Sequence, residues 1–336
     1  MKICIVGLGA IGGLFAAWLG SRAPPGAVQL SALARGATLA AVQQHGLRLH
    51  TADGRVVVPL RAAAQPDELG PQDLVVLAVK GPALASAAPA VQALCGPQTQ
   101  VLVAMNGVPW WFFDGLPGPC AGWQLQTVDP GGAVQSLIAS ARVVGCVVHA
   151  SCTAPAPGEV RHAGGNRLIL GRPAGGLDTQ LQALASLLGS AGFDATVSSR
   201  IQREVWFKLW GNMTMNPVSA LTGATADRIL DDPLVRAFCS AVMVEAQVIG
   251  AAFGIPIEQR AEDRHAVTRR LGALRTSMLQ DVESLRPLEI DALLGSVHEI
   301  GRRLGLATPN IDALLGLVRL MARQRGLYPP GPATPG

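Results

Sequence analysis

The chain has 336 residues, of which 49% are hydrophobic and 15% charged, and its formal net charge is +4. This length predicts one large domain or two medium domains with a large core. Lysines and arginines form no run typical of a nucleic-acid-binding surface, and no segment reaches the roughly 18 uninterrupted apolar residues of a transmembrane helix.

The cysteines and histidines show no metal-binding pattern. The six cysteines form no C-x-x-C pair, and the six histidines show neither H-x-H nor H-E-x-x-H spacing. In a chain of this length we expect reduced cysteines and a cytoplasmic location, with no metal site.

The first part of the chain alternates apolar strands with helices. We expect strands at 3–7, 28–34, 74–79 and 101–105, and helices at 10–21, 37–45 and 82–94. The strand LVVLAV (74–79) is apolar throughout, as is typical of a strand buried on both faces of a parallel sheet. This rhythm predicts an α/β Rossmann-type domain.

The opening residues also resemble a secretory signal, because Lys2 precedes an apolar run. The run divides, however, into a β-branched strand and a turn rich in glycine, and no second charge occurs before Arg22. We therefore favour a strand followed by a turn.

After the fourth strand the pattern changes twice. Short strand-like pieces such as ARVVGCVVHA and NRLILG predict extra strands for the first domain, and long helices follow at 201–222, 233–253, 261–284, 288–304 and 310–325. We predict an NADP-binding Rossmann-type domain at 1–200, an all-α domain at 201–328 and a disordered tail at 329–336. The apolar C-terminal helices are compatible with a homodimer.

A glycine-rich turn follows the first strand. Its residues form a G-x-G-x-x-G motif: Gly7, Leu8, Gly9, Ala10, Ile11 and Gly12. Glycines in this context permit a tight turn and the close approach of a pyrophosphate to a helix N-terminus. The motif predicts dinucleotide binding; the alternative is a packing turn without a cofactor.

Arg35 decides which dinucleotide we expect. An NAD site usually places an acidic residue after the second strand, but no acidic residue occurs here before Asp53. Arg35 follows that strand instead, and its guanidinium suits a 2′-phosphate. We therefore predict NADP(H), although Arg35 could also be an ordinary surface arginine.

Lys80 and Asn106 follow two further strands. Ligands bind at the carboxyl ends of strands in open α/β sheets, so both residues are candidates for ligand contacts. The alternatives are a strand-end charge at Lys80 and a simple turn at Asn106.

Lys208 is one of only three lysines in the chain. A desolvated lysine can release its proton, which an arginine cannot, so Lys208 is a candidate for proton transfer. Asn212 and Asn216 follow at four-residue steps, which keep all three side chains on one face of an apolar helix. The alternative is a lysine that reaches solvent and two amides that bond within the protein.

A second polar cluster comprises SMLQD, beginning at Ser277, and RPLEID, which contains Pro287 and Glu289. Pro287 is expected as the first residue of a helix, with Glu289 in its first turn. Acidic residues are common at helix starts, which gives Glu289 a purely structural alternative.

Together, the glycine motif, the K-x-x-x-N-x-x-x-N-P helix, and SMLQD followed by RPLEID resemble the ketopantoate reductase (2-dehydropantoate 2-reductase) family over about residues 1–325. The resemblance implies an NADP-binding domain, a helical second domain and a cleft between them. It also implies the NADPH-dependent reduction of ketopantoate to pantoate, on the route to pantothenate and coenzyme A.

The resemblance further implies a role for each matching residue. Lys208 would be the catalytic acid, and Glu289 would contact the cofactor and support closure of the cleft. Asn106 would contact both cofactor and substrate. The other substrate-binding residues would be Asn212, Asn216 and Ser277, and the other cofactor-binding residues Gly7 to Gly12, Arg35, Lys80 and, as a weaker match, Ser151.

Two departures from the family leave the identity of the 2-oxo acid open. The family often has an asparagine near the position of Ala226, and the segment 108–113 with the loop to about 135 is unusually long and aromatic. A reductase of another 2-oxo acid is therefore one alternative. Another is a β-hydroxyacid dehydrogenase, although that family places a glycine-rich run before its lysine. A non-catalytic NADPH-binding sensor would need Arg35 but not Lys208.

Overall fold

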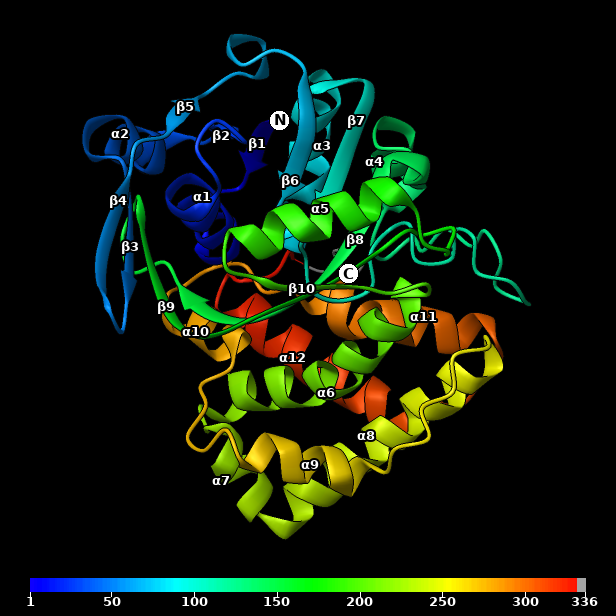
Figure 1. Ribbon diagram of the computed structural model, residues 1–336. Coiled ribbons are helices and arrows are strands. Elements are labelled where there is room, and N and C mark those ends of the chain that lie inside the picture. Colours follow the sequence, from blue (N-terminus) through cyan, green and yellow to red (C-terminus); the bar gives the residue numbers. More distant parts are fainter. Residues whose placement is uncertain (331–336) are drawn as a thin grey trace. The chain divides into compact units, whose positions relative to one another are not determined.

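The computed structural model describes residues 1–330 and divides the chain into two compact units. The first unit comprises Met1–Asn106, Trp111–Leu116 and Gly131–Glu204, and the second comprises Gly107–Trp110, Pro117–Pro130 and the chain from Val205 onward. Figure 1 traces the chain through both units, which are described separately below. Of the predicted tail, residues 331–336 lie outside the described part.

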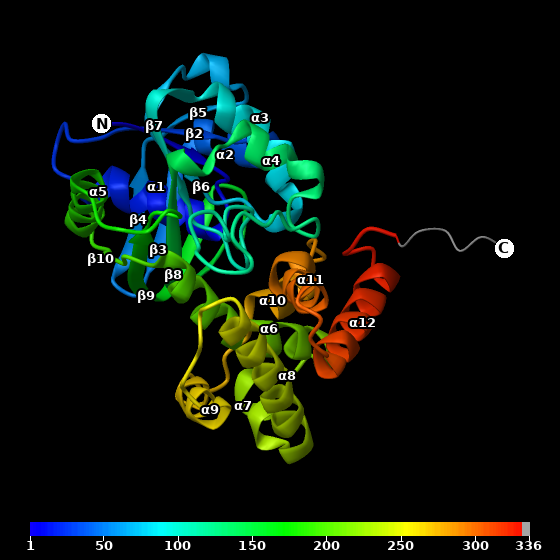
Figure 2. The ribbon, with the colours of Figure 1, turned by 90° about the vertical axis from the view of Figure 1, so that its right-hand side faces the viewer.

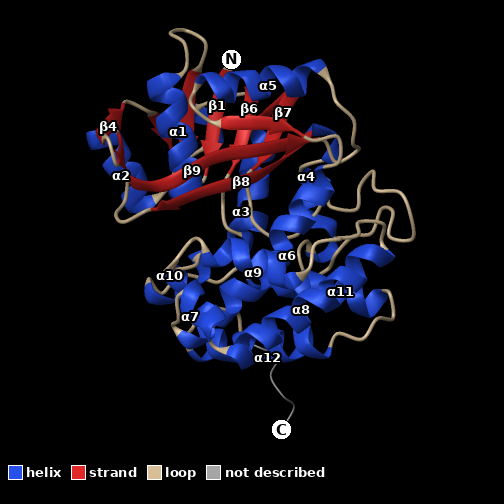
Figure 3. Cartoon of the chain, turned by 60° about the horizontal axis from the view of Figure 1, so that its bottom comes forward, coloured by secondary structure: helices blue, strands red, loops and turns tan. Residues whose placement is uncertain are grey.

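All strands belong to one sheet in the first unit, drawn in red in Figure 3. Their order is β4-β3-β9-β8-β7-β6-β1-β2-β5, with β10 paired to β9. Strands β5, β2, β1, β6, β7 and β8 pair in parallel, whereas β3–β4 and β8–β9 are antiparallel. The strands span Lys2–Val6 (β1), Gln29–Leu33 (β2), Leu47–Thr51 (β3), Gly54–Val58 (β4), Arg61–Ala63 (β5), Gln72–Leu77 (β6), Cys95–Val103 (β7), Val143–Thr153 (β8), Glu159–Gly171 (β9) and Asp194–Val197 (β10).

Helices cover both faces of the sheet, as Figure 2 shows for α1 and α5 on one side and α3 and α4 on the other. Leu74 and Val76 of β6 join the core cluster that α1 and α5 complete, and Val75 and Leu77 alternate to the opposite face. The first unit is therefore a three-layer Rossmann-type domain. Its helices are Ala10–Arg22 (α1), Gly36–His45 (α2), Leu84–Ala93 (α3), Ala133–Leu137 (α4) and Thr179–Ser190 (α5).

The prediction of the first unit is confirmed for its central strands and for α1, α2 and α3. The extra strands predicted from ARVVGCVVHA and NRLILG are β8 and part of β9. The β3–β4 hairpin and β5 were not predicted. The hairpin turns at Gly54, whose φ of +136° favours glycine.

The second unit is helical, and the fold class predicted from the sequence is therefore confirmed for both parts of the chain. Its α-helices are Ile201–Thr222 (α6, whose first four residues belong to the first unit), Ala226–Asp231 (α7), Pro233–Ala252 (α8), Ala261–Arg269 (α9), Ser277–Glu283 (α10), Ser296–Arg303 (α11) and Pro309–Gln324 (α12).

Two helix predictions are wrong in the second unit. The helix expected at 261–284 is two helices, because Gly272 adopts a left-handed φ of +63° and the Thr276 side chain caps a new helix. Pro287 does not begin a helix: the N–H of Leu288 donates instead to the carbonyl of Leu327 at 3.0 Å. Glu289 consequently lies just before a π-helical turn, Asp291–Gly295, and not in a first helical turn.

Among the described helices, α8 alone has the length and apolar composition that a membrane span would need. It nevertheless carries a carboxylate that serves the fold. Glu245 accepts hydrogen bonds from the N–H groups of Asn310 and Ile311, at 2.9 Å each. This satisfies the first turn of α12, so α8 is a packing partner of α12 within the second unit.

Candidate active site

The glycine turn between β1 and α1 has the geometry of a diphosphate-binding loop. Gly7 has a φ of +99°, and a Cβ there would lie 2.9 Å from the carbonyl oxygen of Ala78. A Cβ on Gly12 would collide with the Gly7 carbonyl oxygen, whereas a Cβ on Gly9 would meet no atom within 4 Å. Gly7 and Gly12 therefore keep the turn tight, and Gly9 keeps its outer side open.

The start of α1 fits an anionic group. No side chain caps this helix, and its first turn contains no acidic residue. The first N–H groups of a helix lack intrahelical partners and carry the positive end of the helix dipole. The turn and the helix start thus fit the diphosphate of a dinucleotide.

Arg35 lies at the same edge of the sheet as the glycine turn. Strand β2 pairs in parallel with β1, with Leu33 beside Val6, so Arg35 and Gly7 each follow the end of a neighbouring strand. Arg35 is exposed, and no ion pair of its guanidinium is found among residues 1–330. A cation in this position suits a phosphate on the ribose.

Lys80 and Asn106 complete this edge. Leu77, the last residue of β6, pairs with both Val6 and Val103, so Lys80 and Asn106 each lie three residues beyond neighbouring strand ends. Both are partly buried. Ser151 lies further along β8, where that strand pairs only with β9, and its side chain is exposed.

Helix α6 carries the predicted polar stripe of the second unit. Lys208 and Asn212 are partly buried and Asn216 is 6% exposed, and the helix continues through Pro217 to Thr222. The side-chain amide of Asn216 donates to the hydroxyl of Ser277, the first residue of α10, at 3.4 Å. The two motifs singled out in the sequence therefore meet at this point.

A second contact beside it was missed in the sequence. The hydroxyl of Ser219, which is fully buried, hydrogen-bonds to the hydroxyl of Thr276, the N-cap of α10. Ser219 follows Asn216 by three residues and so lies on the same side of α6. The three-residue step from Asn216 to Ser219, together with the threonine just before SMLQD, could have predicted this contact from the sequence.

Glu289 is buried, with 9% of its surface exposed. It precedes the π-helical turn, which packs closely against the chain at Gly107: the N–H of Val108 donates to the carbonyl of Ala292 at 2.8 Å. Short π-helical segments are frequent at functional sites.

The aromatic segment 108–113 belongs to the protein core. Trp110, Trp111, Phe112 and Phe113 are each 2% exposed or less. Trp111 packs so closely on Gly145 that a Cβ there would lie 2.6 Å from its ring. These side chains are accounted for by packing.

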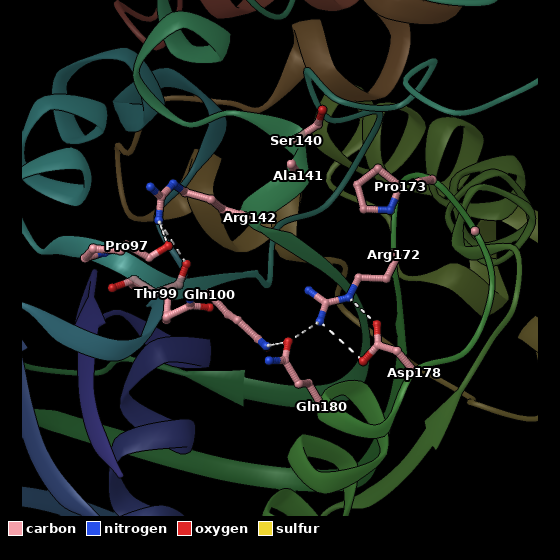
Figure 4. Close-up of a pocket in the computed structure, with 13 residues that line it drawn as sticks. Pro97, Thr99, Gln100, Ser140, Ala141, Arg142, Arg172, Pro173, Asp178 and Gln180 are labelled. Atoms are coloured by element: carbon pink, nitrogen blue, oxygen red, sulfur yellow. Dashed lines mark hydrogen bonds and ion pairs between the residues drawn. The ribbon is translucent and has the colours of Figure 1, made fainter.

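A polar pocket of about 430 Å³ lies at the other end of the strands, near the residues where β7 and β8 begin (Figure 4). Its polar groups largely bond to one another. Arg142 donates to the carbonyls of Gly96 and Pro97 at 2.6 and 3.3 Å, and Arg172 pairs with Asp178 at 2.8 Å. The Arg172 guanidinium thereby lowers the pKa of Asp178. These contacts explain the pocket as a structural feature of the strand ends.

The described residues contain no group of three potential metal ligands from His, Cys, Asp and Glu. All six cysteines have free thiols. Burial raises the pKa of Cys4 to about 11 and that of Cys152 and Cys239 to about 12, so these three groups are thiols, not thiolate nucleophiles, near neutral pH.

Comparison with known proteins gives matches along most of the chain. Residues 3–110 match the family described as ketopantoate reductase PanE/ApbA, and residues 200–322 match the description of its C-terminal part. A 2-dehydropantoate 2-reductase from Mesorhizobium japonicum is 46% identical over 309 residues, which cover 92% of this chain and 94% of the relative.

Solved structures described as ketopantoate reductases are also similar to this chain. A structure from Ralstonia solanacearum MolK2, described as a ketopantoate reductase homologue, has a TM-score of 0.92 and 58% identity over 97% of this chain and 99% of its own. A 2-dehydropantoate 2-reductase from Geobacter metallireducens GS-15 has a TM-score of 0.83 and 27% identity, over 96% of this chain and 100% of its own.

Proposed function

Because the chain belongs to the ketopantoate reductase family, we propose that it reduces 2-dehydropantoate (ketopantoate) to pantoate with NADPH. Family membership makes it an oxidoreductase. The observation that carries the proposal is the hydrogen bond between Asn216 and Ser277, which joins the two polar motifs of the second unit. Its product would serve pantothenate and coenzyme A synthesis in the cytoplasm, in keeping with the six free thiols.

The edge of the first unit supports NADP(H) as the cofactor. The glycine turn and the uncapped start of α1 would hold the diphosphate, and Arg35 would hold the 2′-phosphate. Lys80 and Asn106 would add contacts from the neighbouring strand ends, with Ser151 a weaker candidate. NADPH, when bound, supplies a hydride to the C2 carbonyl.

We assign the proton donor to Lys208. As negative charge develops on the carbonyl oxygen, the ammonium stabilises that charge and gives up a proton to form the alcohol. An arginine would stabilise the charge but keep its proton. A positioned acid typically contributes roughly 10²–10⁴ in rate.

The remaining polar residues would hold the substrate. Asn212 and Asn216 can bond to its hydroxyl and carbonyl groups, and Ser277, held by Asn216, presents a hydroxyl to its carboxylate. Asn106 would contact substrate as well as cofactor. Glu289, buried before the π-helical turn, would contact the cofactor and support closure around the ligands.

The test is an assay of NADPH oxidation with ketopantoate beside a panel of other 2-oxo acids and β-hydroxyacids. A kcat/KM for ketopantoate well above that for every other compound would support the proposal. Preference for a different 2-oxo acid would reassign the substrate. Tight NADPH binding without turnover of any compound would indicate a non-catalytic NADPH-binding sensor.

A second candidate substrate is supported by one residue. Ala226, where the family often has an asparagine, is fully buried, and its N–H donates to the Leu274 carbonyl at 3.0 Å. An alanine offers no side-chain hydrogen bond at this position, which leaves the side chain of the 2-oxo acid open. Oxo acids without the hydroxyl group of ketopantoate are therefore included in the panel.

We further propose that the protein is a homodimer. Helix α8 exposes Val244 and Val248, which lie four residues apart on one face, at 53% and 51% of their surface. Leu317 and Leu320 of α12 are each 57% exposed. Exposed apolar side chains on each of two packed helices are typical of a surface that pairs with another subunit.

A further inference from the structure

The segment that carries Glu289 is bonded on both sides of that residue to the end of the chain. The N–H of Leu288 donates to the carbonyl of Leu327 at 3.0 Å. The hydroxyl of Tyr328 donates to the carboxylate of Asp291 at 2.6 Å. Leu327 and Tyr328 are consecutive residues that follow α12. Glu289, which is 9% exposed, therefore lies between two contacts to this short C-terminal segment.

Regular secondary structure gives the Glu289 segment little support. Residues 286–289 belong to no helix or strand, and they join the end of α10 at Glu283 to the π-helical turn that begins at Asp291. Leu285, just before them, has a left-handed φ of +51° and is the one residue other than glycine with a positive φ in the described part of the chain. Such a conformation is costly for a bulky side chain. Contacts from distant parts of the chain therefore hold Glu289 in place, and the C-terminal segment supplies two beside it.

Tyr328 is the only tyrosine of the chain and is partly buried. Burial raises the pKa of its phenol to about 12, an effect that the hydrogen bond to Asp291 strengthens and the Arg319 guanidinium opposes. The hydroxyl therefore keeps its proton near neutral pH and remains a hydrogen-bond donor. No other hydrogen bond or ion pair of the Asp291 side chain is found among residues 1–330, so this contact fixes the carboxylate.

The far side of the π-helical turn is held in a different way. The N–H of Val108 donates to the carbonyl of Ala292 at 2.8 Å, and a Cβ on Gly107 would collide with that carbonyl oxygen. These contacts do not involve the C-terminal segment. Loss of the Tyr328 hydroxyl should therefore loosen the Glu289 end of the turn and leave the side at Gly107 in place.

We propose that Tyr328 is a positioning residue for cofactor binding: through its hydrogen bond to Asp291, it keeps the Glu289 carboxylate where it can contact the dinucleotide. The inference rests on the proposed function, which assigns that contact to Glu289, and adds a residue that acts through another. A carboxylate only accepts hydrogen bonds, so it suits a hydroxyl or amide donor of the dinucleotide. Such a bond needs a donor within about 3.2 Å, so a small shift of the segment is enough to weaken it.

The test compares Tyr328→Phe, which removes only the hydroxyl, with Thr308→Val, which removes a hydroxyl bonded to the Asp312 carboxylate at 2.7 Å. Each variant loses one hydroxyl–carboxylate hydrogen bond, so both should have a lower Tm. In calorimetric titrations, Tyr328→Phe should weaken NADPH binding by about three- to tenfold, the range for one lost hydrogen bond. Thr308→Val should change it by less than about twofold, because Thr308 lies at the opposite end of α12.

A double-mutant cycle separates positioning from stability alone. Glu289→Ala should itself weaken NADPH binding, and Tyr328→Phe should have no further effect in that background, because both changes act on the same contact. In the cofactor-free protein, hydrogen exchange of residues 286–292 should be faster in Tyr328→Phe than in wild type and unchanged in Thr308→Val.

These measurements require no turnover, so they decide the role of Tyr328 even if ketopantoate is not the substrate. Failure of the proposed function would instead appear as a lack of ketopantoate reduction by wild type. NADPH binding equal to wild type in a folded Tyr328→Phe variant would overturn the inference. An equal loss of binding in Thr308→Val, or additive effects of Tyr328→Phe and Glu289→Ala, would overturn it as well.

Discussion

The side-chain amide of Asn216 lies 3.4 Å from the hydroxyl of Ser277, although 61 residues separate them in the chain. The contact fixes the end of the α6 polar stripe against the start of α10. Beside it, Ser219 bonds to Thr276. Of these two neighbouring contacts, the first involves an exposed serine that can reach a ligand and the second is fully enclosed.

Asn216→Ala and Ser277→Ala should each raise the KM for the 2-oxo acid and leave the KM for NADPH unchanged. In a double-mutant cycle on kcat/KM, the two changes should couple by about 0.5–1 kcal/mol, because each removes the partner of the other. Ser219→Ala is the control, since it should lower the free energy of unfolding without this kinetic effect. Strictly additive effects of Asn216→Ala and Ser277→Ala would contradict a shared substrate contact.

Lys208→Arg should lower kcat by at least about tenfold, because the positive charge remains but the proton is no longer available. NADPH binding, followed by fluorescence or calorimetry, should be unchanged. Unchanged turnover would remove Lys208 from the role of acid.

Arg35→Ala should raise the KM for NADPH by about ten- to a hundredfold, which is the range for a lost charge-assisted hydrogen bond. The KM for NADH should change by less than about twofold, since NADH lacks the 2′-phosphate. Arg55→Ala, at an exposed position of β4, controls for the loss of one positive charge. If Arg35→Ala lowers the affinity for NADPH and NADH equally, Arg35 does not bind the 2′-phosphate.

Gly9→Ala and Gly12→Ala should affect different properties: the first should lower cofactor affinity, and the second should lower thermal stability. At Gly9 the new methyl meets no atom and φ is −81°, so the Tm should shift by no more than about 2 °C while NADPH affinity falls at least about tenfold. At Gly12 the methyl collides with the Gly7 carbonyl oxygen, and the Tm itself should fall. Full cofactor affinity in Gly9→Ala would show that the open side of the turn is not used.

A Val244→Glu/Val248→Glu double variant should be monomeric if the α8 face joins two subunits, because the interface would then bury two unpaired carboxylates. Sedimentation should give about twice the 34.8 kDa chain mass for wild type and a single chain mass for the variant. A wild-type monomer at micromolar concentration would refute the dimer.

Where the sequence was a good guide, the deciding signal was local. The apolar run LVVLAV and the glycines of the first turn act within a few residues, and the structure places both as expected. Polar residues at four-residue steps likewise identified one face of α6.

Where the prediction failed, partners distant in sequence decided the outcome. The N–H of Leu288 bonds to Leu327, so the helix begins later than Pro287 suggests. The sequence left the role of the aromatic residues from Trp110 to Phe113 open, and the fold places them in the core.

The first turn of α1 lacks a capping side chain and an acidic residue, so no side chain of the protein offsets the positive end of its helix dipole. An anionic ligand bound there would stabilise the folded protein as well as take part in the reaction. Its binding would shift the folding equilibrium toward the native state. In a growing cell, the lifetime of this protein would then follow the supply of its nucleotide.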